Sequence, residues 1–77
     1  MKIYLTKHTK ERMALRKITK DMIKSSIFAP DEVGYGYFGR SIAFKKFRNG
    51  VVKIIYLKEK DKHIIISAIW HKKNKKL

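Results

Sequence analysis

The feature that most constrains this chain is a change of residue pattern at Pro30, the one proline among its 77 residues. Before Pro30 the apolar residues recur at helical spacing, whereas after it they alternate or run together as they do in strands. A helix is expected to end there, because the residue before a proline avoids helical backbone angles. The pattern predicts an α+β fold in which two helices precede a sheet. The length allows one domain, expected over residues 1–71, followed by a basic tail over residues 72–77.

Two helices are expected in the first thirty residues, and each follows a threonine. Residues 7–16 are rich in helix formers and come directly after Thr6, whose hydroxyl can accept from the first free N–H groups. Thr19 has the same place before a second helix, which ends at Pro30. Residues 2–5 form a short β-prone opening that the predicted sheet does not include.

The predicted sheet is a four-stranded antiparallel meander with both helices on one face, in the order helix-helix-strand-strand-strand-strand. Its strands are expected at residues 33–38, 41–48, 51–57 and 64–70. Asn49-Gly50 predicts a two-residue hairpin loop, because a type I′ turn needs positive φ at both central positions. This loop would pair Lys45 with Ile54. In the last two strands both the odd and the even positions are apolar, so the side chains on both faces of the sheet are apolar there. This pattern favours central strands that are covered on at least part of both faces.

The chain is strongly basic, with 20 Lys and Arg against 6 Asp and Glu and a formal net charge of +14. Because a charge this large repels itself, a polyanion is the first partner to consider, and a solvated lysine-rich surface is the alternative. Lysine outnumbers arginine, which favours phosphate contact over base reading. We expect nucleic acid, RNA in preference to DNA, to contact Lys7, Lys10, Lys45, Lys46, Arg48, Lys72 and Lys73.

Several classes of function are disfavoured because the sequence has no cysteine, no long apolar run and no cluster of acidic residues. Without cysteine there is no disulfide framework and no thiolate zinc site, which favours a reducing compartment and a cytoplasmic protein. No apolar run approaches the length of a membrane span, so no membrane is expected as a partner. The six acidic residues are scattered, and we expect no metal site and no cofactor. Residues 34–39 (GYGYFG) match a dinucleotide-binding pattern, but a helix stop precedes them and a strand pattern follows, so we reject that interpretation.

The arrangement with the most chemical content is His8-x-x-x-Arg12-x-x-x-Arg16. Spacing of four residues keeps the three side chains on one face of a helix. Arginine can neutralise the charge that develops on a phosphodiester, and histidine can remove the proton of a ribose 2′-OH. The alternative is a solvated helical face. Arg40 begins the second predicted strand, and His71 ends the last one. Either side chain would face this helix if the strands run over it. The alternative is that Arg40 is an ordinary edge-strand arginine and His71 an ordinary histidine at the end of a strand.

Residues 6–19 (TKHTKERMALRKIT) resemble the opening signature of the domain of unknown function 4258 family, which is a His, then Arg-Met four residues on, then Arg and a Gly-Ile-Ser/Thr step. Residues 30–33 and 64–70 resemble its helix-to-sheet junction and its last strand. The family is associated with small RelE-like and BrnT-like folds, which include RNase toxins of toxin–antitoxin pairs. The resemblance implies a RelE-like fold and places His8, Arg12 and Arg16 on motif positions. Lys17 stands where the family often has Gly, which takes a left-handed cap conformation at low cost.

Three functions follow as expectations. The first is a metal-independent endoribonuclease that leaves a 2′,3′-cyclic phosphate, with His8 as base, Arg12, Arg16 and Arg40 as phosphate ligands and His71 as acid. The second is a non-catalytic module that binds nucleic acid or the ribosome through charge alone. The third is a domain that pairs with an acidic, antitoxin-like protein.

Overall fold

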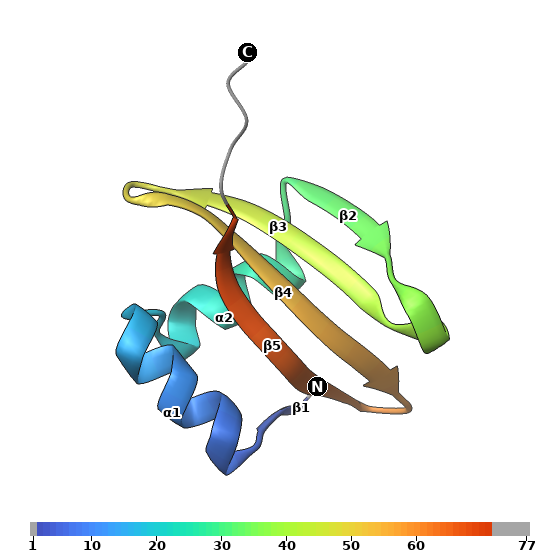
Figure 1. The fold of residues 1–77 in the computed structure, drawn as a ribbon. Coiled ribbons are helices and arrows are strands. Elements are labelled where there is room, and N and C mark those ends of the chain that lie inside the picture. The colour runs from blue at the N-terminus through green and yellow to red at the C-terminus, as the bar shows by residue number, and fades with distance from the viewer. Residues whose placement is uncertain (1, 72–77) are drawn as a thin grey trace.

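The computed structural model describes residues 2–71, and its first element is a strand that precedes both helices (Figure 1). This strand is β1 (Lys2–Leu5), and it leads directly into the two helices, α1 (Lys7–Arg16) and α2 (Lys20–Phe28). The later elements are β2 (Glu32–Tyr35), the short 3-10 helix η1 (Tyr37–Gly39), β3 (Ser41–Phe47), β4 (Gly50–Glu59) and β5 (Lys62–His71). The fold class is therefore α+β, with two helices and a sheet of five strands.

The predicted four-stranded antiparallel meander is wrong, because the sheet has five strands and is mixed. Its strand order is β1-β5-β4-β3-β2, in which β1 runs parallel to β5 and the other neighbours are antiparallel. Residues 2–5 are too few for their pattern to identify a strand alone. Their partner is also remote in sequence, since Ile3 pairs with His63. The pattern of neighbouring residues cannot indicate a parallel pairing between two segments that are this far apart in the sequence.

The β3–β4 hairpin forms at the predicted place but with a different loop. Phe47 pairs with Gly50, so the loop residues are Arg48 and Asn49, and Lys45 pairs with Val52 where Ile54 was expected. Gly50 has a φ of 145°, which side chains rarely permit, and it begins β4 instead of forming the turn. The shift moves the pairing by two residues, so each side chain keeps its predicted face.

The first predicted sheet strand ends earlier than expected. β2 stops at Tyr35, and the chain then turns through η1, where Phe38 takes the left-handed φ of 60°. The glycine-rich stretch is therefore one short edge strand and a tight turn, and residues 36–38 add nothing to the sheet.

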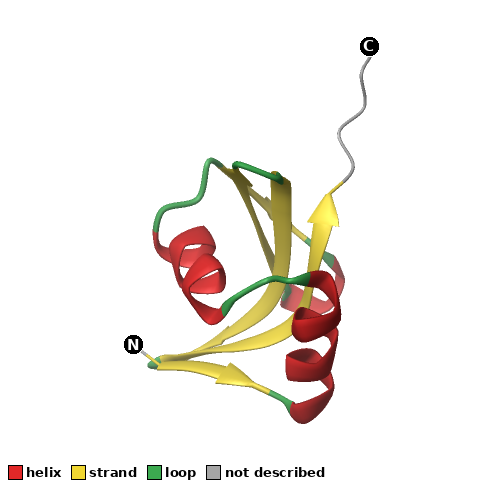
Figure 2. Ribbon diagram, turned by 90° about the vertical axis from the view of Figure 1, so that its left-hand side faces the viewer, coloured by secondary structure: helices red, strands yellow, loops and turns green. Residues whose placement is uncertain are grey.

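One apolar core lies between the helices and the sheet. α1 packs against β5, and α2 packs against β3 and β4. Figure 1 shows α2 behind β3 and β4 with α1 beside β5, and Figure 2 shows the loop that joins the two helices. The buried apolar side chains from both helices, the loop between them and three strands form a single cluster, which comprises Met13, Ile18, Ile23, Ile27, Ala43, Val52, Ile54, Tyr56, Ile65 and Ala68.

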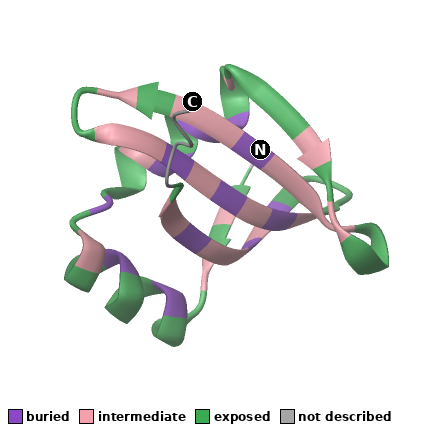
Figure 3. Cartoon of the chain, turned by 45° about the horizontal axis from the view of Figure 1, so that its top comes forward, coloured by how far each residue is buried: buried purple, intermediate pink, exposed green. Residues whose placement is uncertain are grey.

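The opposite face of the sheet is also apolar, and in the described part of the chain no helix crosses it. Along β4 the side chains alternate, so that buried Ile54 lies opposite Ala43 and Ala68, whereas half-buried Ile55 lies opposite Ile42 and Ser67. Figure 3 shows this alternation as bands along the central strands. β4 and β5 are central as predicted, but residues 2–71 cover only one of their faces. We call the other face the open face; its apolar residues are Ile42, Phe44, Val51, Ile55, Leu57, Ile64 and Ile69.

Both predicted N-caps are confirmed, and the first helix ends in a left-handed cap. The hydroxyls of Thr6 and Thr19 each accept a hydrogen bond, from the backbone N–H of Thr9 and of Met22, at 3.1 Å. Lys17 closes α1 with φ 57° and ψ 39°, and its N–H donates to the carbonyl of Ala14. Lysine therefore adopts the conformation for which glycine is better suited.

Replacing Lys17 with Gly is expected to raise the free energy of unfolding by up to about 1 kcal/mol. The left-handed conformation costs a residue with a Cβ about 1–2 kcal/mol, and glycine loses part of this gain through its larger entropy loss. Urea unfolding followed by circular dichroism measures the change. Lys10→Gly, inside α1, is the matched control and should lower stability by about 1 kcal/mol. Equal losses in the two variants would contradict the left-handed cap.

His63 is a buried histidine that the sequence did not single out. It is 3% exposed, and its ring packs edge-on against Phe28 and Tyr56, with centroids 6.0 and 5.1 Å away. Its Nδ1 has no hydrogen-bond partner among residues 2–71. Burial, followed by the positive charge of Lys58, lowers the pKa of His63. Folding therefore favours the neutral form of this imidazole.

Acidification is expected to destabilise the fold through His63. Because the folded pKa lies below the unfolded value of about 6.5, the unfolded chain takes up the proton first. The free energy of unfolding is then largest above pH 6.5 and falls as the pH drops below it. Urea unfolding at several pH values measures the slope. His63→Phe, which keeps an aromatic ring, should flatten the profile, and an unchanged slope in that variant would refute the assignment.

Candidate phosphate-binding cleft

α1 occupies the edge of the sheet where β1 stops. β1 pairs with β5 only as far as Ile65, and the β4–β5 register shifts just beyond, so that Ile66 has no partner in the ladder. Two side chains of α1 form hydrogen bonds with the backbone of β5 at this edge. The Thr9 hydroxyl donates to the Ile65 carbonyl at 3.3 Å, and Arg16 Nη1 donates to the Ala68 carbonyl at 3.0 Å. These two hydrogen bonds tie α1 to the backbone of β5.

The candidate site is a small cleft between this helix and this edge. It has a volume of about 90 Å³, and His8, Arg12 and Arg16 all line it. Spacing of four residues on α1 and the packing of that helix on β5 bring the three side chains together. The wall on the strand side is formed by Ile66, Ser67 and Ala68.

The lining of this cleft is cationic and contains no carboxylate. His8 and Arg12 are exposed, whereas Arg16 is half-buried and uses one nitrogen for the Ala68 carbonyl. A guanidinium has five N–H donors, so Arg16 keeps others for a ligand. Trp70 holds the end of α1 in place, because its indole N–H donates to the Arg16 carbonyl at 2.7 Å. The cleft therefore presents one anchored guanidinium (Arg16), one exposed guanidinium (Arg12) and one imidazole, which suits a phosphate-sized anion.

The structure does not bring Arg40 to this cleft. Arg40 precedes β3, which lies two strands away from β5 in the sheet, and it lines a separate hollow of about 370 Å³ with Tyr37 and Phe38. Its guanidinium carbon is 6.0 Å from the Phe38 ring, and its Nε is buried without a hydrogen-bond partner in the described range. The prediction that Arg40 binds the same phosphate as Arg12 finds no support in this placement.

His71 also lies outside the cleft. It pairs with Val51 at the end of β5, and its ring packs edge-on against Phe44 at 5.1 Å. Phe44 belongs to the open face, whereas Trp70, the preceding residue, points to the helix side. His71 is therefore not placed to act as the acid opposite His8.

The predicted phosphate-binding lysines and arginine fall into different surroundings. Lys7 and Lys10 are exposed on α1, near the cleft in sequence, and Lys46 and Arg48 are exposed at the β3–β4 hairpin. Lys45 has a structural contact instead, because its Nζ donates to the Ala29 carbonyl at the end of α2 at 2.7 Å. Lys72 and Lys73 lie outside the described residues.

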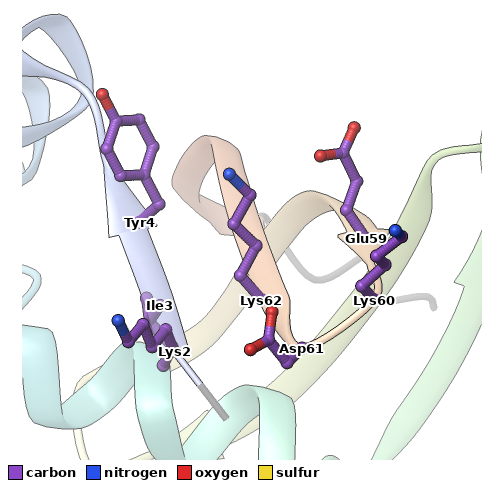
Figure 4. A pocket seen from close by; sticks show the side chains of 7 residues that line it. All are labelled: Lys2, Ile3, Tyr4, Glu59, Lys60, Asp61 and Lys62. Atoms are coloured by element: carbon purple, nitrogen blue, oxygen red, sulfur yellow. The ribbon is translucent and has the colours of Figure 1, made fainter.

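A larger hollow of about 570 Å³ lies at the β4–β5 turn (Figure 4). It mixes lysines with carboxylates, and Figure 4 shows Tyr4 and Lys62 pointing to the same side, with Lys62 Nζ 6.0 Å from the Tyr4 ring. Three lysines and two carboxylates line this hollow, so its excess of positive charge is only one, and the carboxylates oppose an anion. Within residues 2–71, no group of three or more His, Cys, Asp or Glu side chains is arranged to hold a metal ion. None of the helices described is long and apolar enough to cross a bilayer.

Of three comparisons with known proteins, one found a match, and it identifies a family. Searches of curated proteins and of solved structures found no match. The family model described as "Domain of unknown function (DUF4258)" matches residues 5–70, which include all the residues that line the cleft. That description names no activity, and the likeness to RelE-like and BrnT-like proteins stays a prediction. Because the match covers most of the 77 residues, the chain belongs to the DUF4258 family.

Proposed function

We propose that the chain binds RNA at the cleft between α1 and β5 and cleaves it there without a metal ion. The observation that carries the proposal is the lining of this cleft, where His8, Arg12 and Arg16 meet with no carboxylate among them. The excess of positive charge, +14 over the whole chain, favours approach of a polyanion. A carboxylate-free, cationic cleft selects a phosphodiester over a neutral or cationic substrate.

The chemistry follows from the side chains in the cleft. Arg12 and Arg16 bind the non-bridging phosphate oxygens and offset the charge that grows on them. His8 removes the proton from the ribose 2′-OH, whose oxygen attacks phosphorus. The bond from phosphorus to the 5′-oxygen breaks, the leaving oxygen takes a proton from water, and the product is a 2′,3′-cyclic phosphate. Water replaces His71 as the acid, because His71 lies on the open face.

The test is cleavage of a labelled single-stranded RNA in excess EDTA, with the end groups of the products identified by mass spectrometry. The proposal expects cyclic phosphate ends. It also expects no cleavage at a site where the nucleotide carries 2′-deoxyribose, since the nucleophile is then absent. RNA that stays intact with highly purified wild-type chain, or cleavage at the 2′-deoxy site, would refute it.

A non-catalytic RNA-binding module is the second candidate, and one contact favours it. Arg16 already donates to the Ala68 carbonyl, so the same side chain serves the fold whether or not a substrate binds. In this candidate the RNA remains intact in the cleavage assay but binds with a steep dependence on salt.

Substituting Arg12 with Ala is expected to weaken RNA binding about fivefold to tenfold at physiological salt. Arg12 is exposed and lines the cleft. Its loss should make the decrease of log affinity with log salt concentration shallower by about 0.7, the value for one phosphate contact to a single strand. Fluorescence anisotropy at several salt concentrations measures both quantities. Lys24→Ala removes the same charge from the exposed side of α2 and is the matched control. If both variants lose the same affinity, the cleft is not the preferred phosphate site.

A further inference from the structure

We propose that the open face of the sheet binds an acidic, amphipathic helix from a protein partner. This inference is independent of the proposed ribonuclease, because none of the seven apolar residues of the open face lines the cleft.

The open face is a largely apolar surface on three adjacent strands, with Lys53 at its centre. Its seven apolar residues come from β3, β4 and β5, and none of them belongs to the core or packs against it. All seven are half-buried by their neighbours in the sheet and remain accessible on their outer side. In Figure 1 this face lies in front of β3 and β4, while α2 covers the back. Largely apolar surfaces of this kind mark interaction sites.

A helix matches the dimensions of this face. Three strands spaced about 4.8 Å apart span about 10 Å, which is close to the diameter of a helix with its side chains. A helix presents apolar side chains at i, i+3, i+4 and i+7, and such a stripe can contact all three strands. On the opposite side of the same sheet, α2 already packs in this way against β3 and β4.

Lys53 favours a carboxylate of the partner at the centre of the open face, whereas Glu32, which pairs with Phe44 at the β2 edge of the same face, disfavours one there. Lys53 lies in the middle of the open face, paired with Phe44 on β3 and with Ile69 on β5, and its Nζ is 6.0 Å from the Phe44 ring. A wholly apolar partner would bury this ammonium group without compensation, which is costly. A carboxylate beside the apolar stripe of the partner helix would pair with this ammonium group and remove that cost. It would also be attracted by the positive net charge of the chain.

A second copy of this chain does not have the required chemistry. Two open faces brought together would place Lys53 against an identical surface that carries its own Lys53. Each chain also has a formal net charge of +14, so the copies repel each other. An acidic segment meets neither obstacle.

The experiment compares two synthetic helical peptides of about 18 residues. They share one apolar stripe and differ only beside it, where one has Glu and the other has Gln. Binding to the full chain is measured by fluorescence anisotropy in about 0.15 M salt. Amide chemical shifts of the nitrogen-15-labelled chain locate the site.

We expect the Glu peptide to bind at least about tenfold more tightly than the Gln peptide and to shift amides of β3, β4 and β5. Lys53→Met should abolish the difference between the peptides, and Ile55→Thr, which keeps a β-branched side chain, should weaken both. Leu15→Ser is the control, because Leu15 is 80% exposed on α1 and belongs to neither surface. It should change nothing.

Four results would overturn the proposal: no binding of the Glu peptide, equal binding of the two peptides, shifts confined to α1, or a dimer in sedimentation experiments that protects the open face. A single-stranded RNA that shifts the open-face amides when the Glu peptide does not would assign this face to nucleic acid.

Discussion

Substituting His8 with Ala is expected to lower the rate of EDTA-resistant RNA cleavage by at least about 100-fold, since a positioned general base contributes about 10²–10⁴-fold. His8 is the only imidazole that lines the cleft, so no described side chain can replace it. Because His8 is exposed on α1, the substitution should leave the thermal unfolding curve almost unchanged. Single-turnover cleavage of a labelled RNA measures the rate directly.

Two further variants separate the loss of a base from a loss of binding. His8→Gln keeps a hydrogen-bonding group but cannot take up a proton, so it should be as slow as His8→Ala while RNA affinity stays close to wild type. Glu11→Gln changes an exposed residue of the same helix that does not line the cleft, and it should cleave at the wild-type rate. Wild-type cleavage by His8→Ala would show that the base is elsewhere.

Substituting Ile54 with Ala should have the largest effect on stability, a loss of about 3–4 kcal/mol. Ile54 is fully buried in β4, and its two cross-strand neighbours are Ala43 and Ala68. Two alanines cannot extend into the space that the isoleucine leaves, so the cavity stays open. A domain of this size has a total stability near the lower end of about 5–15 kcal/mol, and the variant should be largely unfolded in mild urea.

The matched comparison for Ile54 is its neighbour on the same strand. Ile55→Ala removes the same atoms from the half-buried open face, where solvent fills the space, and should cost less than half as much. Urea unfolding of both variants gives the two free energies. Similar losses would mean that the helices do not cover the face of the sheet that carries Ile54.

Features decided by neighbouring residues could be predicted from the sequence. Thr6 and Thr19 cap helices because their hydroxyls need only the next turn of backbone, and Pro30 acts on the residue just before it. The exact hairpin loop could not be predicted, because Gly50 is placed by the pairing of two whole strands. β1 is the extreme case, since its only partner lies about sixty residues further along the chain.

The same division applies to the candidate site. His8, Arg12 and Arg16 share a cleft because helical spacing is a local property. Grouping Arg40 and His71 with them required the order and facing of strands, which the sequence pattern does not contain. His63 was missed as well; its position two residues before buried Ile65 was the available signal that it faces the core.

The pairing of β1 with β5 has a consequence for the timing of folding during synthesis. The strand-side wall of the cleft belongs to β5, the last element to leave the ribosome among those described. Until residues 62–71 emerge, α1 has no strand edge to pack on, and the Arg16 guanidinium lacks the Ala68 carbonyl to which it donates. A nascent chain from which residues 62–71 have not yet emerged therefore lacks the strand-side wall of the cleft, and the cleft assembles only once β5 can pair.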